Sequence, residues 1–159
     1  MNEYSIIPEC YGDTLLIKTI GYKSANHKHG IGEVNNTMKK YFVNKPAIGI
    51  IDNDKKSIPS DFNKFTEIER KHNLILKRES NSRHFLIVIN PALEDWIESV
   101  GNSLGIKRPY PKNRKEYRKV MKSFMVDKNP QITSYFNSIK QKNPPALRTM
   151  KKWIDDILK

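Results

Sequence analysis

The amino-acid sequence predicts an α/β fold, with a sheet of about four strands, flanking helices and a basic helical subdomain at the C-terminal end. Continuous apolar runs at residues 47–51 and 85–89 are typical of strands buried on both faces. Segments with apolar residues at helical spacing, such as residues 33–43, lie between and beside these runs. The net charge of +12 is concentrated in residues 107–159, which carry 15 basic and 4 acidic side chains.

The expected elements of the N-terminal half begin with a short apolar strand at residues 4–8. Asp13 is expected to cap a following helix that runs to residue 20. Residues 21–32 are polar and predict a loop, and residues 33–43 predict a second helix. The run at residues 47–51, introduced by Pro46, predicts the most deeply buried strand.

The next elements are a short helix around residues 62–68 and two strands at residues 74–76 and 85–89. Asn90-Pro91 then predicts the start of a helix that runs to residue 104, because proline suits the first helical position. Three further helices are expected at residues 115–125, 130–140 and 145–158.

The proline-rich segment at residues 108–111 divides the chain into two expected regions. Residues 1–106 form a nearly neutral α/β domain, with 14 basic and 13 acidic side chains. Residues 107–159 form a basic helical extension packed on or beside it, and this one-sided charge favours a polyanionic partner such as DNA or RNA. The expected nucleic-acid contacts are Lys55, Lys112, Arg114, Lys115, Arg118, Lys119 and Lys122.

Tyr110 and Tyr117 lie among these basic residues, where they could stack on bases, whereas Val120 and Phe124 are expected to face the core. The alternative is that lysines simply fill solvated helix faces. The single cysteine, Cys10, excludes an internal disulfide. No apolar stretch reaches the roughly 18 residues needed to span a bilayer, and no secretory signal pattern is present, so a cytoplasmic protein without membrane contact is expected.

Four acidic residues follow predicted strands. Glu9 comes directly after the first strand, and Asp13 lies one helical turn later. Asp52 and Asp54 come directly after the buried strand. If the two strands are parallel neighbours, these carboxylates converge at the carboxyl edge of the sheet, where they would hold Mg²⁺ or Mn²⁺. The alternative is that Asp52-Asn53-Asp54 is an ordinary turn.

Two segments, residues 7–13 and 47–54, resemble the Toprim domain of topoisomerases, primases and nucleases of the overcoming-lysogenization-defect type. The pattern is an apolar strand followed by Glu, a later acid, a helix, and a second apolar strand that ends in Asp-x-Asp. Glu9, Asp13, Asp52 and Asp54 match these acids, although Cys10 stands where the family has glycine.

The resemblance implies a Rossmannoid sheet and a Mg²⁺-dependent nuclease, with Glu9, Asp52 and Asp54 as catalytic residues and Glu9 as a general acid or base. It also implies the effector of an antiviral defence system that works with a separate ATPase chain, since this sequence contains no P-loop. A non-catalytic nucleic-acid-binding or assembly module is the alternative, and a receiver-like domain is a third. The oligomeric state, a homo-oligomer included, stays open.

Three further groups have both a functional and a structural interpretation. His27 and His29 could bind a metal or a phosphate but fit a solvated loop better. His84 could act as a base, although a structural role at a strand edge is favoured. Glu94, Asp95 and Glu98 could add ligands, but acids at a helix start are more often stabilised by the helix dipole.

Overall fold

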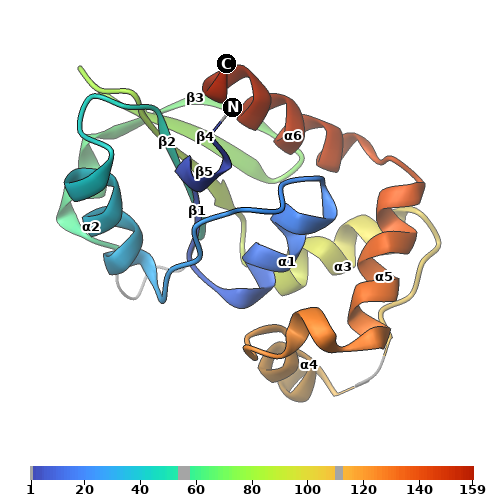
Figure 1. Cartoon of the computed structure of the whole chain (residues 1–159). Coiled ribbons are helices and arrows are strands. Elements are labelled where there is room, and N and C mark those ends of the chain that lie inside the picture. Colours follow the sequence, from blue (N-terminus) through green and yellow to red (C-terminus); the bar gives the residue numbers. More distant parts are fainter. Residues whose placement is uncertain (1, 54–57, 110–112) are drawn as a thin grey trace.

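The computed structural model in Figure 1 describes residues 2–53, 58–109 and 113–159. At its centre lies a five-stranded mixed sheet in the order β1-β2-β5-β4-β3. The predicted α/β class is confirmed, with five strands where about four were expected. The strands are β1 (Ile6–Pro8), β2 (Ala47–Asp52), β3 (Phe65–Lys71), β4 (Leu74–Glu79) and β5 (His84–Ile89).

The first half of the sheet is parallel and the second half is antiparallel. β1 pairs with β2 and β2 with β5 in parallel, whereas β4 and β3 run antiparallel to their neighbours. The amide of Glu9 donates to the carbonyl of Ile50 at 3.1 Å, which extends the β1–β2 pairing by one residue. The carboxyl ends of β1 and β2 therefore lie side by side, as the acidic site requires.

Six α-helices and three short 3-10 helices surround the sheet in the described part of the chain. The α-helices are α1 (Tyr11–Thr19), α2 (Ile31–Tyr41), α3 (Leu93–Ser103), α4 (Arg114–Met121), α5 (Pro130–Gln141) and α6 (Pro145–Leu158). The 3-10 helices are η1 (Glu3–Ser5), η2 (Ser60–Lys64) and η3 (Val126–Lys128).

The helices cover both faces of the sheet. Alternate side chains of β2 point to opposite sides, so that Ile48 and Ile50 join one apolar cluster while Ala47 and Ile51 join the other. The first cluster contains α1, α3, α5 and α6, and the second contains α2 and η2. Figure 1 shows α2 alone among the α-helices on its side of the sheet. Burial on both faces explains why β2 is apolar without alternation.

Helices from the basic end of the chain belong to the same apolar cluster as the first helix. Phe136 of α5 and Met150 of α6 are buried with Leu16 of α1 and Trp96 of α3. α5 packs against α1, and α6 contacts β2 and β4. No helix in the described ranges is both long and apolar enough to cross a membrane.

The two edges of the sheet are protected differently. At the β1 edge, the amides of Asn26, Lys28 and Gly30 donate to the carbonyls of Ile6, Pro8 and Glu9 at 2.8–2.9 Å. The loop that contains these amides thus seals the edge. At the other edge, β3 is exposed over all residues after Phe65, and its polar and charged side chains discourage pairing with another chain.

Three local predictions are wrong. The short helix expected around residues 62–68 is instead η2 followed by β3, which forms a hairpin with β4 through His72 and Asn73 at φ of 54° and 58°. Positive φ at both central residues is the geometry that two-residue hairpins favour. Pro91 lies before the helix rather than in it, because α3 begins at Leu93 after a cis Asn90-Pro91 bond.

The third correction concerns the start of α1. Cys10, not Asp13, occupies the N-cap position, and its Sγ accepts a hydrogen bond from the Asp13 amide at 3.4 Å. Asp13 is therefore inside the first turn of the helix. Its carboxylate is turned towards the sheet, where a capping aspartate would have been turned towards its own backbone.

Candidate metal centre

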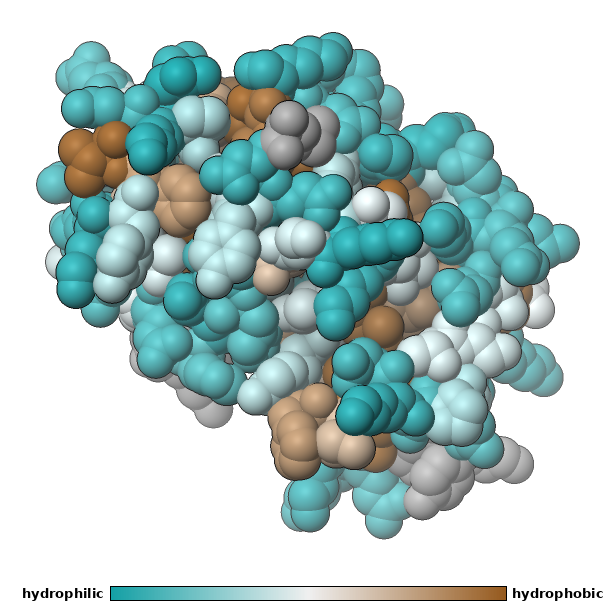
Figure 2. All heavy atoms as spheres, in the orientation of Figure 1, coloured by the Kyte–Doolittle hydropathy of each residue, from teal (hydrophilic) through white to brown (hydrophobic). Residues whose placement is uncertain are grey.

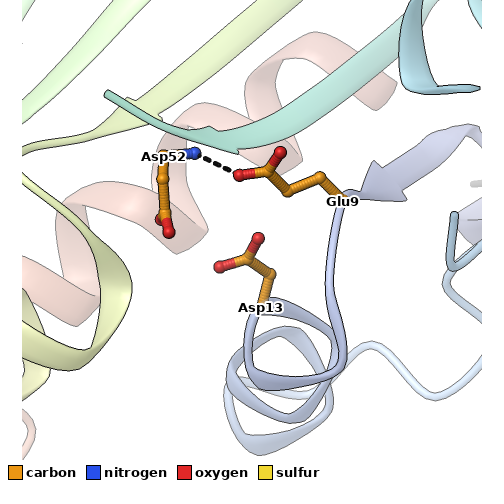
Figure 3. A group of neighbouring side chains, drawn as sticks. All are labelled: Glu9, Asp13 and Asp52. Carbon is orange, nitrogen blue, oxygen red and sulfur yellow. Dashed lines mark hydrogen bonds between the residues drawn. The ribbon is translucent and has the colours of Figure 1, made fainter. Parts of the chain in front are cut away.

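Three carboxylates from separate elements meet at the carboxyl ends of β1 and β2. Glu9 directly follows β1, Asp13 lies in the first turn of α1, and Asp52 ends β2. One oxygen from each residue lies within 4.8 Å of the other two. Figure 3 shows the three side chains turned towards one another. The sequence-based expectation that Glu9, Asp13 and Asp52 come together is confirmed.

Backbone amides hold two of these carboxylates. The Asp52 amide donates to Glu9 Oε1 at 2.7 Å, so the end of β2 fixes the side chain that follows β1 (Figure 3). The Leu93 amide donates to Asp52 Oδ1 at 3.0 Å. Leu93 is the first residue of α3, whose N-terminus therefore points at Asp52 and stabilises its negative charge.

Asp13 differs from the other two acids. Its side chain is fully buried, and neither carboxylate oxygen has a nitrogen or oxygen donor in the part of the chain that the structure describes; the weakly donating Cys10 thiol alone lowers its pKa through a hydrogen bond. Leaving such a group unsatisfied is costly, since a buried polar atom without a partner loses about 1–3 kcal/mol of stability and a charged one loses more. An ion between Asp13, Glu9 and Asp52 would satisfy it.

Burial and like charge both oppose ionisation at this centre. Burial, followed by the charge of Glu9, raises the pKa of Asp52 to about 8. Burial, followed by the charges of Asp52 and Glu9, raises the pKa of Asp13 well above its usual range. Burial and the neighbouring Asp13 raise the pKa of the Cys10 thiol. A divalent cation reverses this situation, because it favours the ionised carboxylates that repel one another in its absence.

Two charged residues near the centre come from α3 and α4. Glu94 is buried in the first turn of α3, and its charge raises the pKa of both Asp13 and Asp52. Lys122 follows α4, and its charge lowers the pKa of Asp52. Glu94 was expected to be a helix-dipole residue with a less favoured role as a ligand, and the structure puts it within electrostatic reach of the site.

A missing side chain allows the close packing around the acids. A Cβ on Gly12 would lie 2.8 Å from Leu93 Cδ2 and 2.8 Å from the carbonyl oxygen of Met121. α1, the start of α3 and the end of α4 therefore meet at this glycine. No pattern in the sequence indicates this role, because nothing there shows which helices approach Gly12.

The remaining predicted site residues fall into two groups. Asp54, Lys55 and Lys112, together with Tyr110, lie outside the described residues. The predicted contacts on and after α4 are all exposed, namely Arg114, Lys115, Arg118, Lys119 and Lys122.

Two of these arginines are engaged within the protein. Arg114 forms an ion pair with Asp95 of α3, and Arg118 approaches the same carboxylate at 3.3 Å. Asp95 thus anchors α4 to α3. Glu98 pairs similarly with Arg108 at 3.4 Å. These two acids make structural contacts, whereas Lys115, Lys119 and Lys122 are exposed on or directly after α4.

The burial of Tyr117 and the exposure of Phe124 are the opposite of what the sequence predicts. Tyr117 is only 1% exposed and lies under the guanidinium of Arg108, so it cannot stack on a base. Phe124, expected in the core, is 66% exposed. The reason is that α4 ends at Met121, so the helical spacing that predicted an inward Phe124 no longer applies there.

The structure shows where His84 and the pair His27 and His29 lie. His84 begins β5 at the opposite end of the sheet, and its Nε2 contacts the Phe42 carbonyl oxygen at 2.9 Å, which is a structural role. His27 and His29 lie in the loop beside β1 with their rings 4.8 Å apart. Burial, followed by the charge of His29, lowers the pKa of His27. Among the described residues, no third metal-binding side chain joins these two.

Comparison with known proteins gives no match: no family model fits the chain, and neither a curated protein nor a solved structure is similar to it. The chemistry of the site must therefore be judged from its residues. Carboxylate oxygens are the ligands of hard divalent cations, and a buried carboxylate without a partner is what such an ion would satisfy. Glu9, Asp13 and Asp52 could bind a metal ion.

Proposed function

We propose that this protein is a divalent-metal-dependent enzyme that cleaves phosphodiester bonds of nucleic acid, with Glu9, Asp13 and Asp52 as the ligands of Mg²⁺ or Mn²⁺. The observation that carries the proposal is the buried Asp13 carboxylate, which faces two other carboxylates and has no nitrogen or oxygen donor among the described residues. When bound, the metal would neutralise the phosphate and lower the pKa of an attacking water.

The residues of the chain would supply position and charge. Glu9 and Asp52 are oriented by the amides of Asp52 and Leu93, so their oxygens are fixed before a ligand arrives. Glu9 is the least buried of the three acids, which suits a general acid or base that must reach a substrate. Asp54 would follow as a further ligand, as the resemblance to Toprim domains implies.

Positive charge near the acids favours a polyanionic substrate. Exposed lysines of α4 and the residues after it, Lys115, Lys119 and Lys122, lie on the segment that packs against α1 at Gly12. Lys122 is close enough to affect the pKa of Asp52. Such lysines attract phosphates without reading sequence. An antiviral nuclease that works with a separate ATPase chain remains the more specific form of this proposal.

The test is cleavage of single-stranded and duplex DNA and RNA by the purified chain with Mg²⁺, with Mn²⁺ and with EDTA. We expect cleavage only with metal, and we expect Asp52→Asn to reduce it by at least about 100-fold, since a lost ligand costs more than the 10- to 100-fold typical of groups behind the ligands. Asp156→Asn is the matched control, because Asp156 is an exposed acid on α6.

Cleavage that is unchanged by Asp52→Asn would refute the assignment. A protein that binds neither Mg²⁺ nor Mn²⁺ by calorimetry but still binds nucleic acid would instead support the non-catalytic binding module. In that case the acids would have only a structural role, and protonation would have to remove the cost of burying their charges.

A further inference from the structure

Four rings gather beside the acidic centre. The Tyr11 ring stacks on His27 with ring centres 4.2 Å apart and an angle of 19° between the planes. His29 and Phe124 meet Tyr11 edge-on at 5.5 and 6.3 Å. Tyr11 comes from α1, the histidines from the loop along β1, and Phe124 from the segment after α4. Three distant stretches of the chain thus build one aromatic cluster.

Hydrogen bonds fix the ring of His27. Thr14 Oγ1 donates to the Cys10 carbonyl at 2.9 Å, so its own proton is already used. The contact of 2.8 Å between Thr14 Oγ1 and His27 Nδ1 must then be donated by the histidine. His27 is held as the Nδ1–H form with a defined ring plane, on which Tyr11 lies. The stacked pair of Tyr11 and His27 therefore has a defined orientation.

A groove of about 300 Å³ opens at this cluster. Its walls are Tyr11, His27 and Phe124, and its apolar floor includes Leu15 and Val126. Lys18 and Lys23 lie at its rim, with Asp127 opposite Lys18 at 3.8 Å. Figure 2 shows apolar atoms standing out among hydrophilic ones at the lower edge of the molecule, where Figure 1 places the segment around α4. Aromatic walls with lysines at the rim fit a flat ring that carries a phosphate.

The groove is linked to the acidic centre by one backbone hydrogen bond and by the segment that follows α4. The Gly30 amide, next to His29, donates to the carbonyl of Glu9 at 2.9 Å. On the other side, Phe124 follows Lys122 by two residues, and the charge of Lys122 acts on Asp52. Tyr11 and Asp13 both belong to the first turn of α1, but they are two residues apart and their side chains leave the helix in different directions.

We propose that this groove is a subsite for an unpaired nucleobase, which stacks on the ring of Phe124 with its edge towards Tyr11, while its phosphates meet Lys23 and compete with Asp127 for Lys18. This inference rests on the proposed function, which it sharpens to a substrate with unpaired nucleotides next to the bond that is cut. A base within a duplex has both faces covered by its neighbours, so it offers no free face to the rings. The overall net charge of +12 favours the polyanionic ligand.

The test measures binding without cleavage, by fluorescence anisotropy in EDTA. The probes are a labelled single-stranded DNA of about 12 nucleotides, which suits a small site, a strand of equal length made of abasic nucleotides, and the matching duplex. We expect the single strand to bind tightest. Phe124→Ala should weaken its binding by about 10-fold, within the range of base–aromatic stacking, and leave the abasic strand unaffected.

Phe124 is mostly exposed, so its removal is not expected to disturb folding. Phe124→Tyr keeps the ring and should retain binding. Tyr41→Ala is the matched control, because Tyr41 is 61% exposed on α2 and lies on the other side of the sheet.

The outcomes separate the two proposals. Base-dependent binding that Phe124→Ala weakens, in a protein that never cleaves, supports the subsite and refutes the nuclease. Equal binding of normal and abasic strands, or no effect of Phe124→Ala, overturns the subsite even in an active nuclease. A protein that binds none of the three probes overturns the subsite as well.

Discussion

Ionisable groups are buried at both ends of the parallel strands, but their hydrogen bonding differs between the two ends. At the amino end, His84 is 8% exposed, with Nε2 at 2.9 Å from the Phe42 carbonyl oxygen and Nδ1 at 3.4 Å from Glu79. At the carboxyl end, Asp13 is fully buried and has no nitrogen or oxygen donor in the described part of the chain. The Tyr117 hydroxyl and His27 Nε2 are also buried without a partner among the described residues, but Asp13 is the one such group that can carry a negative charge and that faces two other carboxylates.

The largest expected effect is on metal binding at the carboxyl end. Asp13→Asn and Asp52→Asn should each weaken the binding of Mn²⁺ by at least about 100-fold, because each removes a charged ligand. Titration calorimetry measures this directly. His84→Ala should leave the affinity unchanged, and equal losses in all three variants would show that the two ends are not functionally distinct.

Substitutions at the two ends of the parallel strands should change the free energy of unfolding in opposite directions. In metal-free protein at pH 8, Asp13→Asn should stabilise the fold by about 1–2 kcal/mol, because the amide is neutral without taking up a proton and can donate to a neighbouring carboxylate. His84→Ala should destabilise it by about 2–3 kcal/mol, because Phe42 and Glu79 lose their partner and a cavity remains. Urea unfolding compares the two, and a destabilising Asp13→Asn would mean that Asp13 is satisfied.

The pH dependence of stability belongs to the carboxyl end alone. The pKa of Asp52 rises from 3.8 to about 8 on folding, so the folded state keeps a proton that the unfolded chain has lost. Stability should therefore fall as the pH rises from about 4 to about 8. We expect the melting temperature in EDTA to drop by several degrees between pH 5 and pH 8.

Excess Mn²⁺ should remove most of this drop, since the metal binds the ionised carboxylates. The double variant Asp13→Asn, Asp52→Asn should lack the drop even in EDTA. A melting temperature that rises steadily across this range in the unmodified, metal-free protein would contradict the expected origin of the effect.

The last expected effect concerns the packing that brings the acids together. Gly12→Ala should cost about 1–3 kcal/mol, because its Cβ would meet a backbone oxygen that cannot move alone. Gly32→Ala on α2 is the control, since nothing lies within 4 Å of its Cβ, and it should stabilise the helix slightly. Thermal unfolding distinguishes them, and a Gly12→Ala variant as stable as Gly32→Ala would show that α1 and α4 are not tightly packed.

The parts of the fold that the sequence predicted are those with a strong burial signal. Within β2 and β5, residues 47–51 and 85–89 are continuously apolar because both faces of the sheet are covered, and such runs predict strands whatever the strand order. β3 was missed because an edge strand exposed on both faces has no such signal. Its true marker was local, in the His72-Asn73 turn that leads into β4.

The site was predictable where it depended on topology and unpredictable where it depended on packing. Glu9 and Asp52 follow strands that pair in parallel, so their meeting was a consequence of strand order. The complete burial of Asp13 depends on contacts at Gly12, which no local pattern reveals. Phe124 was misplaced because the helical spacing was extended beyond the end of α4.

The loop that seals β1 has a consequence for how copies of this chain meet. Three main-chain carbonyls of residues 6, 8 and 9 are covered by amides of residues 26, 28 and 30. Deletion of this loop would leave a bare strand edge directly beside the carboxylates. Such an edge recruits strands from other molecules, so the shortened chain would tend towards domain swapping and fibre growth.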